Sequence, residues 1–329
     1  MIKKILTLYG SVFVILLLLN FFLPRLMPGG PIEYLDGQDS GPMLTEAQKA
    51  SMIEYYNLNA SLGAQFIDYL GGLLHLDFGY SFSYKEPVTD IVLNHLPYTL
   101  WIVGISTSLS LIIGILFGLW SGWFHFKRGD RRFMLTMMAV GALPEFLMGM
   151  ILLLVFAVYL GVLPMSGASK PFLSSDSWWT VISDYAQHAA LPIITLTIVS
   201  ISSTYLLVRN ETIQVISSPF IEFAKMKGIK RNRLVYRHIL KNALLPIFTL
   251  MMIRIGTLFT GAIFVETLFS YPGIGKLLKE AVLSRDYPLM HGLFFVFSAI
   301  ILFFNALADF LYPKLDPRVK GGNKNEQGL

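Results

Sequence analysis

The chain contains no cysteine, and this absence removes several kinds of chemistry at once. Disulfide bonds, thiolate nucleophiles and cysteine-ligated zinc or iron–sulfur centres are all excluded. The six histidines are scattered, at positions 75, 95, 125, 188, 238 and 291, without the spacing of a metal site. We therefore expect no metal to be bound by this chain.

Charged residues are scarce as well. They make up 14% of the 329 residues, whereas a soluble globular protein has about 25%. Apolar residues account for 54%, and the mean hydropathy is +0.59. This composition indicates an integral membrane protein. The net charge of +5 does not by itself indicate nucleic-acid binding, because the basic residues are gathered in a few segments.

Nucleotide-binding and hydrolytic motifs are missing too. A phosphate-binding loop requires G-x-x-x-x-G-K-[ST]. The similar stretch SYPGIGKLL contains Gly275 and Lys276, but Ser270 takes the place of the first glycine and Leu277 follows the lysine. Neither H-E-x-x-H nor G-x-S-x-G is present. We expect a chain that is not an enzyme and has no cofactor of its own.

Long apolar runs are abundant. Crossing the hydrocarbon core of a bilayer takes about 20 apolar residues. Six runs meet this length, at about 5–23, 99–122, 134–160, 189–208, 243–267 and 290–312. The first follows Lys3 and Lys4 but is too long for a signal peptide and lacks a cleavage site, so we interpret it as a retained span. The sequence thus predicts an all-α polytopic membrane protein with six transmembrane helices.

Two of the runs carry prolines. Pro144 lies inside the third run and predicts a kink, and the fourth run is expected to begin near Pro192. The fourth run is also rich in serine and threonine, which favours a position inside the helix bundle over one facing lipid throughout.

Connecting segments that are rich in basic residues alternate along the chain with segments that are not. Lys3 and Lys4 precede the first span, and segments 123–133 and 209–242 together hold twelve bases. By the positive-inside rule these segments and both termini are cytoplasmic. Segment 24–98 holds nine acids and three bases and is expected outside. Its length predicts a small extracytoplasmic subdomain, with short helices at LTEAQKASMIEYYNL and from Phe66 to Leu76.

The most basic segment reads EFAKMKGIKRNRLVYRHILKNALLPI. Between Glu222 and Lys241 it has seven bases and one acid. Upstream, Ser218 is suited to cap a short helix that has Pro219 at its first position. Gly228 is suited to the left-handed residue that ends this helix.

A second short helix is expected to follow, with Asn232 as its cap. One face would carry residues at helical spacing: Leu234, Val235, His238 and Ile239. Another face would carry the bases Arg233, Arg237 and Lys241. From the pattern alone, the segment could lie on anionic lipid head groups or dock a soluble partner.

This segment resembles the EAA loop of the membrane subunits of ABC importers, in which Glu-Ala-Ala is followed after three residues by Gly. Glu222, Ala224 and Gly228 fit that spacing, with Phe223 in place of the first alanine. More narrowly, the chain resembles the B-type permeases of the oligopeptide, dipeptide and nickel uptake family. Similar segments occur in order along essentially the whole chain: RLMPGGP, LDFGYSFSYKEPVTDIVLNHLPYTL, HAALPIITLTI, FVETLFSYPGIGKLL, RDYPLMHG and LYPKLDPRVK. Gly30 stands where that family usually has aspartate.

The resemblance implies a type I importer fold in a bacterial or archaeal cytoplasmic membrane. It divides the chain into a first span (1–23), an extracytoplasmic subdomain (24–98), a permease core with five spans (99–312) that includes a coupling loop (209–242), and a tail (313–329). It also implies partners: a second, C-type permease, two ATPases that hold ATP and magnesium, and an extracytoplasmic solute-binding protein. The residues expected to contact the ATPase are Glu222, Phe223, Ala224, Lys225, Lys227, Gly228, Arg233, Arg237 and His238.

Ionisable residues within apolar runs are candidates for the transport pathway, because they are costly in lipid. Glu145 follows Pro144, Arg254 lies in the fifth run, and Asp309 near the end of the sixth is expected to be an anchor. Met148, one of several methionines around Glu145, suits either core packing or the lining of a peptide path.

Several functions stay open. The substrate of such an importer could be an oligopeptide, a dipeptide, nickel or a metal chelate. An intramembrane enzyme would have to use Glu145, Asp309 or His188, without a recognisable catalytic pair. A channel or scaffold would need no ATPase, and the basic loop would then bind only lipid.

Overall fold

A computed structural model describes residues 2–28, 50, 53–54, 57, 59–125, 127–171, 177–230, 233–240, 256 and 259–315. Its regular structure is helical apart from an isolated bridge between Tyr80 and Pro87. The chain forms two compact units. Unit 1 comprises Met1–Thr99 and Pro272–Leu302, and unit 2 comprises Leu100–Tyr271 and Phe303–Leu329.

Aromatic packing holds unit 1 together. Its helices are α1 (Ile2–Leu26), α4 (Leu62–Leu74), α12 (Ile274–Leu283) and the first parts of α5 (Val88–Trp123) and α13 (Tyr287–Leu315). Phe21 of α1 is fully buried, with the Phe66 ring of α4 at 5.0 Å and the His291 ring of α13 at 6.1 Å. The helix predicted from Phe66 to Leu76 is present as α4, which begins four residues earlier, after the Ser61 cap, and ends two residues earlier at Leu74.

A buried carboxylate fixes the start of α13. Asp286 is fully buried and accepts hydrogen bonds from Ser81 Oγ at 2.5 Å and from the Ser83 backbone N–H at 2.9 Å. Its other oxygen accepts from the backbone N–H of Leu289, 3.2 Å away, as a helix cap does. One aspartate thus joins the loop before α5 to α13.

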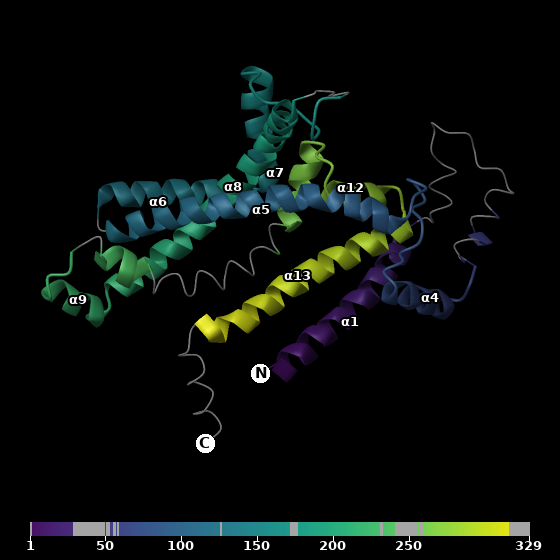
Figure 1. Cartoon of the computed structure of the whole chain (residues 1–329), viewed down its shortest axis with the longest axis horizontal. Coiled ribbons are helices and arrows are strands. Elements are labelled where there is room, and N and C mark those ends of the chain that lie inside the picture. The colour runs from purple at the N-terminus through teal and green to yellow at the C-terminus, as the bar shows by residue number, and fades with distance from the viewer. Residues whose placement is uncertain are drawn as a thin grey trace, which may run out of the picture. The chain divides into compact units, whose positions relative to one another are not determined.

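Unit 2 is built around the long helix α8. Its other helical elements are the remainder of α5, α6 (Arg128–Gly141), α7 (Glu145–Leu152), η1 (Leu153–Tyr159), α9 (Pro219–Met226), η2 (Leu234–Leu240), Phe259–Leu268 and the end of α13. α8 itself covers Trp178–Ile216. Both α5 and α6 run along α8, and α9 lies beyond its carboxyl end (Figure 1).

A row of glycines brings α5 against α8. Gly114, Gly118 and Gly122 recur every four residues and therefore share one face of α5. A Cβ atom on Gly118 would lie 2.5 Å from Val208 Cβ, and Cβ atoms on the other two would lie 2.7 Å from threonine side chains of α8. Small residues at this spacing allow close helix packing in membranes. We call this contact the glycine seam.

Four described helices are long and apolar enough to cross a membrane, namely α1, α5, α8 and α13. α6 together with α7–η1 makes a possible fifth span, bent by 98°. A kink was expected at Pro144. The structure instead has a break between two helices at this proline, with a change of direction of 98°. Most of the expected fifth span, 243–267, lies outside the described residues, as does most of LTEAQKASMIEYYNL.

The expected boundaries of the fourth run are wrong at both ends. α8 begins at Trp178, so that Pro192 lies inside it, and it continues to Ile216, eight residues beyond the predicted end. A helix end in apolar surroundings would leave backbone groups unpaired, so continuation through a proline is tolerated there. The expectation of an interior position agrees with the structure, because half of the most apolar stretch of α8 is buried, against 17% in α13.

Candidate functional site

Local signals form the helix α9 as the sequence predicts. Ser218 is the N-cap residue, although its hydroxyl donates back to the Val215 carbonyl, and Pro219 follows at the first position. At the other end Gly228 has φ +73°, a left-handed conformation that glycine adopts without strain. The N–H of Gly228 bonds to the Lys225 carbonyl at 2.9 Å, and that of Ile229 to the Ala224 carbonyl at 3.3 Å. These two bonds form a Schellman motif, which closes the helix.

The two faces of α9 have different environments. Ile221 and Ala224 are buried in an apolar cluster with Leu119 of α5, Val208 of α8, and Leu234 and Ile239 of η2. The residues on the other face are exposed: Glu222, Phe223, Lys225, Met226 and Lys227. The Lys227 ammonium lies 4.8 Å from the centre of the Phe223 ring. One face of the helix is therefore anchored in the apolar cluster, and the opposite face exposes an aromatic ring and charges of both signs.

The second predicted helix is present but is a π-helix, η2. Its hydrogen-bond pattern brings residues five apart close together, and Leu234 and Ile239, five apart, are both buried. Arg233, just before it, is exposed as predicted. Asn232 and Lys241 and the side chains of Arg237 and His238 lie outside the described residues.

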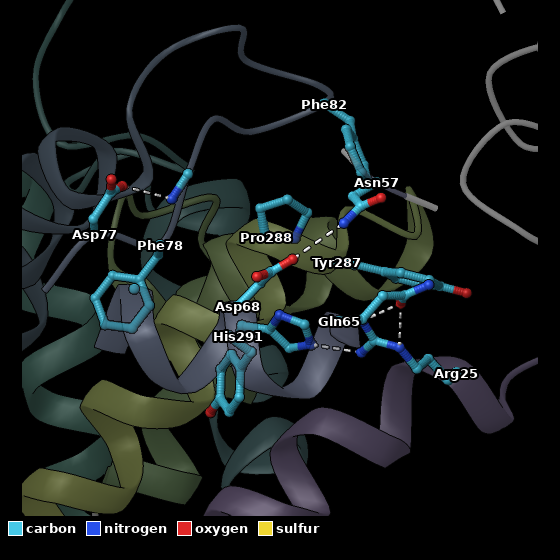
Figure 2. A pocket seen from close by; sticks show the side chains of 13 residues that line it. Arg25, Asn57, Gln65, Asp68, Asp77, Phe78, Phe82, Tyr287, Pro288 and His291 are labelled. Carbon is cyan, nitrogen blue, oxygen red and sulfur yellow. Dashed lines mark hydrogen bonds between the residues drawn. The ribbon is translucent and has the colours of Figure 1, made fainter. Parts of the chain in front are cut away.

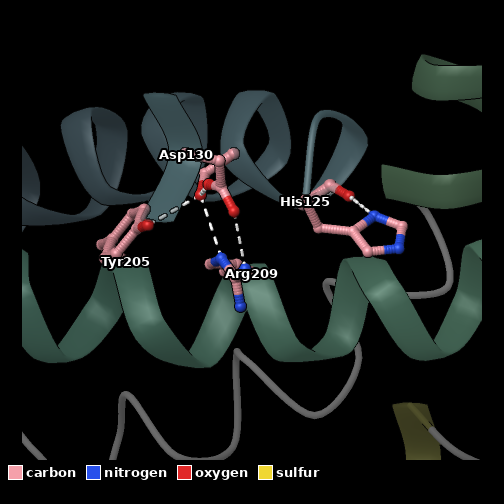
Figure 3. Close-up of polar contacts among 6 residues, drawn as sticks. His125, Asp130, Tyr205 and Arg209 are labelled. Carbon is pink, nitrogen blue, oxygen red and sulfur yellow. Dashed lines mark hydrogen bonds and ion pairs between the residues drawn. The ribbon is translucent and has the colours of Figure 1, made fainter. Parts of the chain in front are cut away.

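Just before α9, a polar network joins three helices (Figure 3). An Arg209 N–H of α8 donates to Asp130 Oδ2 of α6 over 2.7 Å, and Arg209 Nε donates to Ser121 Oγ of α5 over 3.0 Å. Ser121 also donates to the other Asp130 oxygen and lies 2.7 Å from the Tyr205 hydroxyl. The Asp130 side chain is 1% exposed and that of Arg209 is 12% exposed. We call this group the buried clamp.

Sequence reasoning missed the clamp. Both residues fall in segments that were expected to be cytoplasmic connections, Asp130 in 123–133 and Arg209 at the start of 209–242. Asp130 in fact lies in the first turn of α6, where an acid is stabilised by the helix dipole. One signal could have revealed the clamp: the helical pattern of the fourth run continues through Arg209. An arginine within a spanning helix needs an acidic partner, because an unpaired charge is costly there.

The pathway candidates take different positions. Glu145 begins α7 directly after the corner, partly exposed, with its carboxylate against Gly261, where a Cβ atom would lie 3.3 Å from Oε1. Met148, one turn later, is buried. Arg254 lies outside the described residues. Asp309 is exposed on α13.

His188 offers no support for an enzyme. It is buried, and its Nδ1 lies 2.8 Å from the Asp184 carbonyl one turn earlier in α8. Its Nδ1 is also 3.6 Å from the carboxylate of the same aspartate. Both contacts are within one helix, and neither Glu145 nor Asp309 is brought into contact with it in the described part of the chain. No group of three or more potential metal ligands occurs among the described residues.

Unit 1 contains a pocket of about 290 Å³ around the end of α1 (Figure 2). There the Arg25 guanidinium covers the Phe21 ring at 3.6 Å, donates to Gln65 of α4 at 2.9 Å and lies 3.3 Å from His291 Nε2. Burial raises the pKa of Tyr69 in α4 to about 12, an effect that Arg25 opposes. Arg25 is thus engaged in holding α1, α4 and α13 together.

The fold and site define a polytopic membrane protein in which the long helix α8 leads into a short, anchored helix that exposes an aromatic ring and charges of both signs. A family model described as "Binding-protein-dependent transport system inner membrane component" matches residues 114–321, more than half of the chain. The chain belongs to this family.

Similar proteins cover nearly the whole chain. The oligopeptide transport system permease protein AppB of Bacillus subtilis is 31% identical over 92% of this chain and 93% of its own length. OppB of Haemophilus influenzae, with the same description, is 31% identical over 97% and 98%. The glutathione transport system permease protein GsiC of Escherichia coli is 30% identical over the same shares. The resemblance to B-type permeases of ABC importers is thereby confirmed, and the chain is a transport subunit of a multi-pass membrane assembly.

Proposed function

We propose that this chain forms half of the translocation pathway of an ATP-driven importer for oligopeptides or dipeptides. The substrate class is supported by the names of AppB and OppB, which refer to oligopeptides. Import of nickel or a metal chelate by the same kind of complex is the alternative, and it lacks such support among the relatives described above.

The proposed architecture has six spans with both termini in the cytoplasm. The first span and an extracytoplasmic subdomain occupy 1–23 and 24–98, and the permease core and cytoplasmic tail occupy 99–312 and 313–329. The basic segments 123–133 and 209–242 favour this orientation. The fifth span completes the bundle at 243–267, and the apolar helix Phe259–Leu268 forms its last part.

The single observation that carries the function is the form of α9. Ile221 and Ala224 fix it to α5 and α8, whereas Glu222, Phe223 and Lys225 point away from the chain. A helix held this firmly can transmit a push as a rigid body. We infer that an ATPase binds the exposed face, with Lys227, Gly228, Arg233, Arg237 and His238 extending the contact.

The complex proposed has five chains in a bacterial or archaeal cytoplasmic membrane. This permease pairs with a homologous C-type permease, and each binds one ATPase, which holds ATP and magnesium. A solute-binding protein delivers the substrate from outside. Glu145, Met148 and Arg254 are proposed to line the pathway, which the position of Glu145 at the corner before α7 supports.

Purification in mild detergent tests this function. The chain is isolated from its native host, and ATP hydrolysis is measured with and without peptide and binding protein. We expect two ATPases to copurify, and peptide to stimulate hydrolysis. Glu222→Ala is expected to weaken that stimulation roughly tenfold, because Glu222 is an exposed member of the contact.

The matched control is Glu211→Ala in α8, an acid in the same segment that belongs to no proposed contact. It should leave both copurification and stimulation within about twofold of wild type, as is usual for substitutions away from such features. A chain that purifies without ATPases in several detergents would refute the importer and return α9 to the role of a lipid-surface helix.

A further inference from the structure

The corner segment α6–α7 is attached to α8 at three levels. The buried clamp joins Asp130 to Arg209 near the start of α6. At the end of α6, a Cβ atom on Gly141 would lie 2.7 Å from Ser202 Cβ. Beyond the corner, one on Gly149 would lie 3.3 Å from Thr195 Cγ2. The segment that carries Glu145 therefore follows α8 along much of its length.

α8 is in turn coupled closely to α9. Ser217 and Ser218 alone separate the two helices, and both are tied to the last turn of α8. The N–H of Ser217 bonds to the Ile213 carbonyl at 3.0 Å, and the hydroxyl of Ser218 bonds to the Val215 carbonyl. Because this two-residue connection is short and hydrogen-bonded, a movement of α9 is transmitted directly to α8.

The three attachments differ in how they resist sliding. Contacts of glycine with small side chains, such as those of Gly141 and Gly149, are apolar and non-directional, so a shift along the helix exchanges one contact for a similar one. The clamp cannot shift in this way. Arg209 presents its N–H groups in a rigid fork, and separation would leave the buried Asp130 charge uncompensated.

We propose that Asp130 and Arg209 are positioning residues for coupled transport, which make α6 and α7 move together with α8 when ATP-driven motion reaches α9. This proposal rests on the proposed function and deepens it. Ser121 and Tyr205 orient the pair: Ser121 bonds to both charged groups, and the Tyr205 hydroxyl bonds to Ser121. Loss of the pair leaves the ATPase contact intact but disconnects it from the pathway.

The test uses the complete complex reconstituted in proteoliposomes. Peptide uptake and ATP hydrolysis are measured together for wild type, Asp130→Asn, Arg209→Gln and the exchanged pair Asp130→Arg with Arg209→Asp. We expect the single variants to assemble and hydrolyse ATP, but to take up roughly tenfold less peptide per ATP. The exchanged pair should recover at least half of the loss, because it restores attraction between α6 and α8.

The matched control is Arg131→Gln, which removes an exposed charge beside Asp130. It should keep the wild-type ratio of uptake to hydrolysis. If the exchanged pair does not assemble, the neutral pair Asp130→Asn with Arg209→Gln takes its place and should be as uncoupled as either single variant. Uptake and hydrolysis that fall in parallel, or a ratio that stays at the wild-type value, would overturn the proposal.

A second readout follows the motion itself. Because the chain lacks cysteine, Phe146→Cys on α7 and Gln214→Cys on α8, both exposed, can carry spin labels when the partner chains have no accessible cysteine. In wild type the distance between the labels should stay constant when ATP is added. In Asp130→Asn it should change or broaden with ATP. An unchanged distance in that variant would refute the proposed role of Asp130 and Arg209 in holding α7 to α8 during the movement.

The two proposals fail in different ways. A wild-type complex that shows no peptide-dependent hydrolysis contradicts the importer. A wild-type complex that couples uptake to hydrolysis, beside clamp variants with the same ratio, contradicts only the role of Asp130 and Arg209.

Discussion

Two groups of charges in unit 2 lie close together along α8 and α9 but behave differently. On α9, Glu222, Lys225 and Lys227 face outward from a helix that is held by apolar anchors. In the clamp, Asp130 and Arg209 are buried against each other. Exposed charges leave the fold unaffected and are available to a partner, whereas buried charges determine which helices stay together. The same residue types therefore serve recognition in one place and mechanical connection in the other.

Removal of one buried charge should have the largest effect on stability. Asp130→Ala leaves the Arg209 guanidinium uncompensated, and breaking a buried ion pair in this way costs about 3–5 kcal/mol. We expect a clear fall in the thermal unfolding midpoint of the detergent-solubilised chain. The apolar pair Asp130→Leu with Arg209→Met is the informative control, because such replacements are often neutral. If it is as unstable as the single variant, the uncompensated Arg209 charge is not the cause of the loss.

The glycine seam should come next. Gly118→Ala places a methyl group against Val208 and overpacks the contact, which costs about 1–3 kcal/mol. Gly104→Ala on the same helix α5 has no atom within 4 Å of its new Cβ and should instead stabilise by up to about 1 kcal/mol, through helix propensity. Opposite shifts of the two unfolding midpoints would support close packing at the seam. Equal shifts would contradict it.

Gly228→Ala tests the end of α9 without a steric clash. No atom lies within 4 Å of the added Cβ, so the expected cost of about 1–2 kcal/mol comes from the left-handed backbone alone. Gly228→Asn should recover part of it, because asparagine tolerates this conformation. ATPase binding measured by copurification should fall with stability in the same order. An alanine variant as stable as wild type would show that the turn is not required.

Neutralising an exposed charge should have the smallest effect on the fold. Lys225→Gln is expected to change the free energy of unfolding by less than about 0.5 kcal/mol. Its effect on ATPase stimulation should nevertheless be measurable, because Lys225 belongs to the exposed face of α9. A variant that loses stability but keeps stimulation would reverse the roles assigned to the two groups.

The difference also explains what the sequence could and could not predict. Ser218, Pro219 and Gly228 were identified correctly because each acts on the backbone within a few positions. The spans α1, α5 and α13 were found because their apolar composition is continuous, although α5 begins at Val88, eleven residues before the expected start at 99. The clamp was not found, because Asp130 and Arg209 are 79 positions apart and their pairing depends on how α6 lies along α8. Pro192 was misread because the surrounding bundle allows a helix to continue through a proline.

The corner between α6 and α7 interrupts the backbone hydrogen bonds that run along the two helices. The chain turns by 98° there: the N–H groups of Ala142 and Leu143 close α6, and those of Leu147 and Met148 bond to the Pro144 carbonyl, so the N–H groups of Glu145 and Phe146 have no acceptor in a preceding helical turn. Pro144 provides no N–H at all. Hydrocarbon cannot hydrogen-bond such groups, so backbone of this kind is tolerated at membrane depth only where protein or water satisfies it. A hydrated spot beside Glu145 would lower the barrier to a polar solute that crosses at this point.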